Sequence, residues 1–197
     1  MPARSPSEAV DAFVGRLRRT LQCAVKGTVF GSGSNLGRLH SVTLCPDGQD
    51  CGSFARLRTH QGEGEILFEF VYLYAVVHQG ARHGRGEFEV RTSFYQYNVL
   101  DREQRELVAY HWEPEGISPI RTPHVHMPVI GSIVLPQHPG SAVASAKTHL
   151  GKMHMPTGRV SVEDIVEMLI REFAVDPQRA DWMEVLQDNR PIEDPGA

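Results

Sequence analysis

The sequence predicts an α+β fold in which helices from both ends of the chain flank an antiparallel sheet of five or more strands. Amphipathic helical patterns occur near the two ends of the chain. β-Branched and aromatic residues are frequent from about residue 39 to 112. Short, turn-rich links join the strand-like runs, which favours antiparallel pairing over parallel strands with crossover helices.

The length and composition fit one globular domain, because the 197 residues are 41% hydrophobic and 22% charged. We expect a single domain over 1–197. It would contain an N-terminal helix (1–27), a sheet with a His-rich loop region (38–160), C-terminal helices (161–187) and a frayed tail (188–197).

The sequence predicts no membrane segment and a cytoplasmic location. The longest apolar run, Ile66–Val77, is too short to span a bilayer, and the N-terminus has no apolar signal-peptide core. Cys45 and Cys51 flank a turn and could pair across a hairpin. In a reducing cytosol, however, we expect both to be free thiols.

The N-terminal helix begins at a cap. Ser5 is a capping residue, Pro6 suits the first helical position, and Glu8 follows the cap by three residues. The apolar positions with helical spacing are Val10, Phe13, Val14, Leu17 and Leu21. Gly27 is the expected end, and Gly31–Gly37 is predicted to be a flexible linker. No Gly-Lys-Ser/Thr follows that linker, so it lacks the phosphate-loop fingerprint.

The strands come next. The predicted runs are 40–44, 54–59, 66–77, 87–99 and 107–112. Within 87–99 the alternation places one set on one face: Phe88, Val90, Thr92 and Phe94. It places the other set on the opposite face: Glu87, Glu89, Arg91, Tyr95 and Tyr97. Two helices then follow, one capped by Ser161 and a short one beginning near Asp176–Pro177.

The most unusual stretch is 116–162, which has no Asp or Glu but holds five of the ten histidines, in a chain of net charge −4. Histidine near neutral pH serves as acid, base or metal ligand. His124 and His126 are two residues apart, so an extended chain places both rings on one face. The small-residue loop 134–146 could let His149 and His154 lie beside them.

These residue types suit metal-independent cleavage of RNA, without a cofactor. His124 or His126 would be the base and His149 or His154 the acid, because the reaction takes one proton and returns another. The expected phosphate-binding cations are Lys152, Arg159 and Arg121. The expected base-stacking rings are Tyr95, Tyr97, Tyr110 and Trp112.

Two other classes of function stay open. The first is a zinc or iron site formed by His124, His126 and His154. No Glu follows His-x-His, as it would in a cupin, and a magnesium nuclease would need carboxylate ligands. The second is a non-catalytic binding protein or complex subunit, which the negative net charge suits better than RNA binding.

Four short motifs carry a family resemblance: Tyr95-Gln96-Tyr97, Val108–Trp112, Pro123–His126 and Ser161–Asp164. Through them, 94–173 resembles the TumE-like toxins of bacterial toxin–antitoxin pairs. The resemblance implies an RNA-directed toxin whose protein partner is an antitoxin. The segment Met153–Val160 also resembles a group of uncharacterised bacterial proteins, and that likeness implies no function.

Overall fold

The computed structural model describes residues 3–60, 65–79, 87–116, 120–128, 132–134, 147–149 and 154–190. The helices are α1 (Pro6–Leu21), α2 (Val162–Arg171) and α3 (Trp182–Asn189). The strands are β1 (Gly27–Gly31), β2 (Leu39–Pro46), β3 (Ala55–Arg58), β4 (Glu65–His78), β5 (Phe88–Leu100), β6 (Glu106–Trp112), β7 (His124–His126), β8 (Ser132–Val134), β9 (Lys147–His149) and β10 (His154–Pro156).

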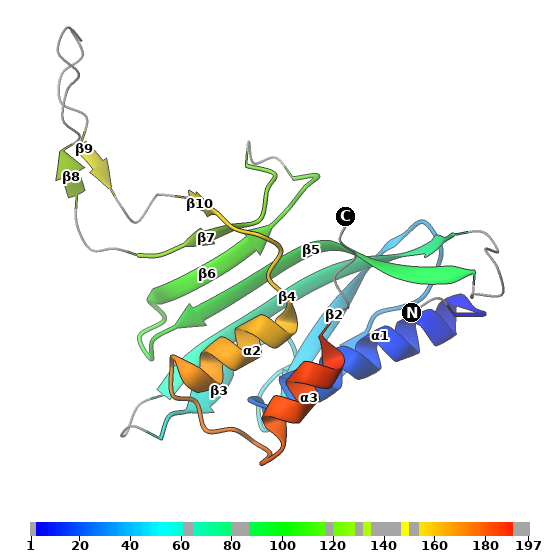
Figure 1. Ribbon diagram of the computed structural model, residues 1–197, viewed down its shortest axis with the longest axis horizontal. Coiled ribbons are helices and arrows are strands. Elements are labelled where there is room, and N and C mark those ends of the chain that lie inside the picture. The colour runs from blue at the N-terminus through cyan, green and yellow to red at the C-terminus, as the bar shows by residue number, and fades with distance from the viewer. Residues whose placement is uncertain are drawn as a thin grey trace, which may run out of the picture.

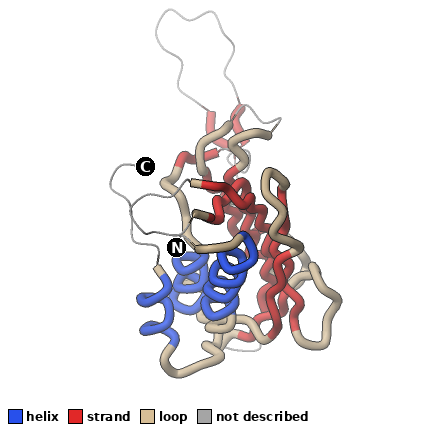
Figure 2. Tube along the Cα trace, turned by 90° about the vertical axis from the view of Figure 1, so that its right-hand side faces the viewer, coloured by secondary structure: helices blue, strands red, loops and turns tan. Residues whose placement is uncertain are grey.

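The predicted α+β arrangement is confirmed. Among the described residues an eight-stranded antiparallel sheet runs in the order β1-β2-β4-β5-β6-β7-β10, with β3 paired to β4. The strands β8 and β9 pair separately. Figure 1 shows the order of the strands, and Figure 2 shows that the three helices lie on one side of the sheet. The opposite side, called here the outer face, is not covered by these helices.

The predicted caps at Ser5 and Ser161 are present, whereas the cap predicted at Asp176–Pro177 is not. The Ser5 hydroxyl accepts a hydrogen bond from the Glu8 amide, and Ser161 and Asp164 form a reciprocal capping box at α2. The last helix begins later than predicted, at Trp182 instead of near Asp176. The Asp176 amide donates to the Arg58 carbonyl, so this segment is tied to β3 before α3 begins. Residues 191–197 of the predicted tail lie outside the described residues.

The segment after α1 differs from the predicted linker. Strand β1 was missed, because only three residues separate the two glycines that bound it. Beyond it, the glycine-rich loop is held in place: the Tyr74 hydroxyl donates to the Gly33 carbonyl at 2.6 Å, and the His40 ring lies 3.0 Å from the Asn35 carbonyl oxygen. The loop is therefore anchored to the sheet.

A β-bulge changes the predicted face of the β5 tyrosines. The register with β4 shifts between Leu73, opposite Phe94, and Tyr74, opposite Thr92. Ser93 is therefore extra, and the alternation reverses there. Tyr95 and Tyr97 lie on the helix-covered face with Thr92, and Phe94 lies on the outer face. The prediction that grouped Tyr95 and Tyr97 with the charged residues of 87–91 is wrong.

The core lies between the sheet and the helices. Tyr97 stacks on Tyr95 and Phe70, with ring centroids 4.8 and 5.9 Å apart. Residues from α1, α2 and α3 close the other side: Val10, Val14, Leu17, Ile165, Val166, Leu169 and Leu186. One charged side chain, Glu163, is fully buried among them and accepts a hydrogen bond from the Thr20 hydroxyl at 2.9 Å.

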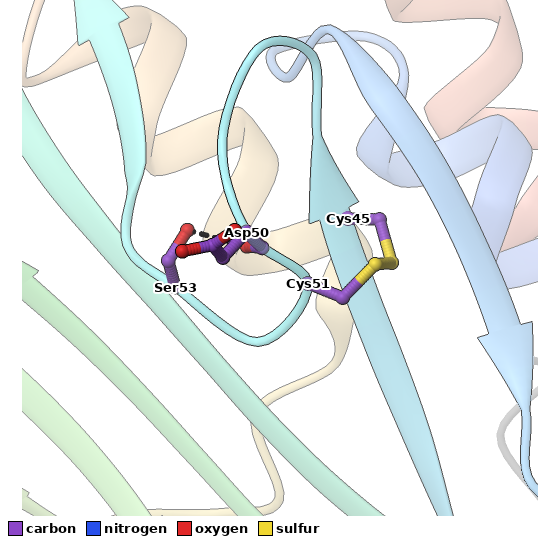
Figure 3. The surroundings of a disulfide bond; sticks show 4 residues. All are labelled: Cys45, Asp50, Cys51 and Ser53. Atoms are coloured by element: carbon purple, nitrogen blue, oxygen red, sulfur yellow. Dashed lines mark hydrogen bonds between the residues drawn. A yellow bond between two sulfur atoms is a disulfide. The ribbon is translucent and has the colours of Figure 1, made fainter.

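Cys45 and Cys51 form a disulfide, so the prediction of free thiols at these positions is wrong (Figure 3). Cys23 is free and buried. Disulfides are typical of oxidising compartments, and the cytoplasmic location stays a prediction from the sequence. No helix among the described residues is long and apolar enough to cross a membrane.

Candidate functional site

Strands β6, β7 and β10 form one edge of the sheet (Figure 1). Four histidines gather on these three strands. His111 of β6 is opposite His124 of β7, and His126 of β7 is opposite His154 of β10. Directly opposed residues of antiparallel strands share a face, as do residues two apart on one strand. All four side chains therefore lie on the same face of the sheet.

That face is the outer one. The residues that alternate with the histidines point into the core: Val125 is buried, and the Tyr110 hydroxyl donates to Met168 Sδ of α2 at 3.8 Å. We call His111, His124, His126 and His154 the histidine cluster. Its inner members are buried or half-buried, whereas His154 is exposed.

The rings of the cluster are in contact with one another. The closest pair is His126 and His154, whose ring centroids are 4.2 Å apart. The His111 ring lies 4.7 Å from His126 and 5.7 Å from His124. One ring nitrogen from each of His111, His124 and His126 lies within 4.8 Å of the other two. Two nitrogens bound to one zinc ion are at most about 4.2 Å apart, since zinc–nitrogen bonds are about 2.0–2.1 Å long, so small rotations of these rings would bring all three nitrogens onto a single ion.

Hydrogen bonds fix which nitrogen of two rings is protonated. His124 Nδ1 lies 2.9 Å from the Thr122 carbonyl oxygen, which only accepts, so Nδ1 donates and Nε2 keeps its lone pair. His111 Nε2 lies 3.3 Å from Asn98 Oδ1, and the Asn98 amide nitrogen donates to the Glu69 carboxylate. Metal-binding histidines commonly use this pattern, in which the second ring nitrogen donates to a carbonyl or carboxylate.

His126 has a buried ring nitrogen without a partner. Its Nε2 is inaccessible to solvent and makes no hydrogen bond in the described structure. Buried polar atoms in proteins are nearly always satisfied, so this one requires an explanation. A metal ion held by the neighbouring rings would supply the partner.

The site favours neutral imidazoles. Burial first, and then the charges of His126, His124 and His154, lower the pKa of His111 from 6.5 to about 4. Burial, His154 and His124 lower the pKa of His126 in the same way. Neutral imidazole is the form that binds metals.

These shifts predict a pH-dependent stability of the metal-free protein. A lowered folded pKa means that the folded state binds fewer protons than the unfolded chain. The stabilisation is therefore complete above about pH 6.5, the unfolded pKa, and is lost as the pH falls towards 4. We expect urea midpoints to fall less between pH 8 and 5 in His111→Gln than in the wild type. Equal falls in His111→Gln and in the wild type would contradict the prediction.

Three of the four predicted catalytic histidines converge: His124, His126 and His154. Of His149 only the backbone is described, paired with Ser132 in β8–β9, and Lys152 lies outside the described residues. Arg121 is exposed. Arg159 stacks on Trp112, its guanidinium carbon 4.3 Å from the ring centroid.

The predicted base-stacking surface is not present. Tyr95, Tyr97 and Trp112 are 3%, 1% and 8% exposed, and the half-buried Tyr110 packs on α2. Tyr95 and Tyr97 stack on each other and Arg159 covers Trp112, so these rings belong to the core and are not open to bases.

His111 was missed as a site residue. The signal was present in strand 106–112, where Val108, Tyr110 and Trp112 alternate as core positions and leave His111 on the other face. The sequence could not pair that position with His124, because the register of β6 and β7 is a tertiary property.

No protein-family model matches the chain, and no curated protein or solved structure matches it either.

Proposed function

We propose that the chain binds a divalent transition-metal ion, with zinc as the first candidate, through His111, His124 and His126. The observation that supports this most strongly is the buried, unpartnered Nε2 of His126 beside two rings whose tautomers are fixed by hydrogen bonds. Imidazole-only donors suit zinc, copper, iron and nickel, whereas calcium and magnesium require oxygen ligands.

The exposed His154 lies beside these three ligands on the edge strand. Three protein ligands and an open position are typical of catalytic zinc, which lowers the pKa of a bound water to about 7. We therefore assign His154 to the neighbourhood of the open position, where it would exchange protons with a bound water. On this proposal the protein is a metal-dependent hydrolase or lyase.

Metal titration of chelator-treated protein tests the proposal. We expect a single Zn²⁺ or Co²⁺ ion to bind each chain, with a visible Co²⁺ absorption spectrum typical of nitrogen ligands. His126→Ala should weaken binding by more than the roughly 10- to 100-fold that the loss of outer-shell partners costs. His60→Ala, which removes a histidine in the turn after β3, should bind like the wild type. The same weak binding in all three proteins would rule the site out.

Metal-independent RNA cleavage is a second candidate. The observation that favours it is the contact between His126 and His154, whose rings are close enough to reach one phosphate. This candidate function has no open aromatic surface for base stacking among the residues predicted for it. It predicts RNA cleavage in the presence of a chelator and growth arrest on expression, both lost in His126→Ala. The TumE-like resemblance and an antitoxin partner stay predictions tied to this candidate. A protein that neither binds metal nor cleaves RNA would fit a non-catalytic binding subunit.

A further inference from the structure

A chain of polar contacts leads along the outer face to the histidine cluster. Glu69 of β4 is directly opposite Asn98 of β5, and their side chains are hydrogen-bonded. Asn98 in turn contacts His111 of β6. Three neighbouring strands therefore each contribute one member to a line that ends at a proposed metal ligand.

The chemistry of the carboxylate determines the direction of every hydrogen bond in this line. An ionised carboxylate only accepts hydrogen bonds, so it must face the NH₂ group of Asn98. The Asn98 carbonyl oxygen must then face His111, and it too can only accept. His111 Nε2 is therefore the protonated nitrogen, and Nδ1 keeps the lone pair.

The burial of Asn98 makes this arrangement costly to change. Asn98 is only 8% exposed, and Glu69 is half-buried. Rotation of the amide by 180° would set the carbonyl oxygen against the carboxylate and the NH₂ group against the ring nitrogen. The hydrogen bond to Glu69 would be lost and two acceptors would face each other, at a site with little water to compensate. The line is therefore fixed in one orientation.

We propose that Glu69 and Asn98 are positioning residues that hold His111 in the Nε2–H tautomer and present its Nδ1 to the metal. This inference rests on the proposed metal-binding function. Neither residue touches the metal itself.

The first readout is the tautomer of His111 in metal-free protein at pH 8, measured by long-range ¹H–¹⁵N NMR of the side chain. We expect Nε2–H in the wild type and a mixture of tautomers in Glu69→Gln and Asn98→Ala. Glu69→Gln preserves the shape of the side chain, so the test stands even if Asn98→Ala does not fold. Nδ1–H in the wild type, or an unchanged tautomer in both variants, would overturn the inference.

The second readout is the Zn²⁺ dissociation constant, which we expect to rise about 10- to 100-fold in both variants. Glu89→Gln is the matched control, because Glu89 also accepts a hydrogen bond from an amide, that of Gln79, but lies outside the cluster. It should bind Zn²⁺ like the wild type. Wild-type Zn²⁺ affinity in Glu69→Gln and Asn98→Ala would overturn this inference and leave the proposed metal-binding function standing. Absence of binding in the wild type overturns the proposed function, and the tautomer then still decides whether Glu69 and Asn98 fix His111.

Discussion

Zn²⁺ is expected to stabilise the folded protein by about 2.7 kcal/mol at a free concentration about 100 times its dissociation constant, and by about 4.1 kcal/mol at about 1,000 times. The reason is that the folded state brings His111, His124 and His126 together, whereas the unfolded chain separates them. Urea unfolding curves at pH 7.5, with and without Zn²⁺, measure the increment.

The increment should disappear in His124→Ala. Because His124 is 5% exposed, this substitution also lowers the stability of the metal-free protein, and the Zn²⁺-dependent difference separates the two effects. His60→Ala is the control and should keep the whole increment, since the His60 ring lies near Asp176 and away from the cluster. An equal Zn²⁺ effect in His124→Ala would place the metal elsewhere.

Tyr97→Ala is expected to lower the free energy of unfolding by about 3–5 kcal/mol, the range for truncation of a buried aromatic side chain. Tyr97 is 1% exposed and stacks between Tyr95 and Phe70 under the helices, so its removal leaves a cavity. Equilibrium urea unfolding, monitored by tryptophan fluorescence and circular dichroism, gives the value.

Tyr97→Phe is the control for Tyr97→Ala. It keeps the ring and its stacking, so it should cost much less. The two roles considered for Tyr97 predict different results. A base-stacking residue on an open surface would tolerate alanine with little loss of stability, and the variant would lose RNA binding instead. A loss below about 0.5 kcal/mol would contradict the core position.

The sequence predicted the elements of the fold well wherever a local signal was strong. Ser5 and Ser161 marked the beginnings of α1 and α2, because a capping residue acts within its own helical turn. The long run of β-branched and aromatic residues marked β4. Strand β1 was missed because Thr28, Val29 and Phe30 are too few to show a period.

The faces of the strands were predicted only up to the first irregularity. Phe88, Val90 and Thr92 share the helix-covered face as expected. The bulge at Ser93 then exchanges the two faces of β5. A bulge is a property of the pairing between β5 and β4, so the sequence of β5 alone does not reveal it. This is the physical reason that Tyr95 and Tyr97 were predicted to share a face with the charged residues of 87–91 and are instead buried.

The sequence by itself determined that His124 and His126 share a face, because the two-residue period of a strand needs no partner. It also drew attention to the acid-free stretch that contains His154. Only the tertiary structure decided that His111 lies beside these histidines, and that Asn98 contacts His111 and is itself hydrogen-bonded to Glu69. These residues come from separate strands, and cross-strand register is set by packing of the whole sheet against its helices.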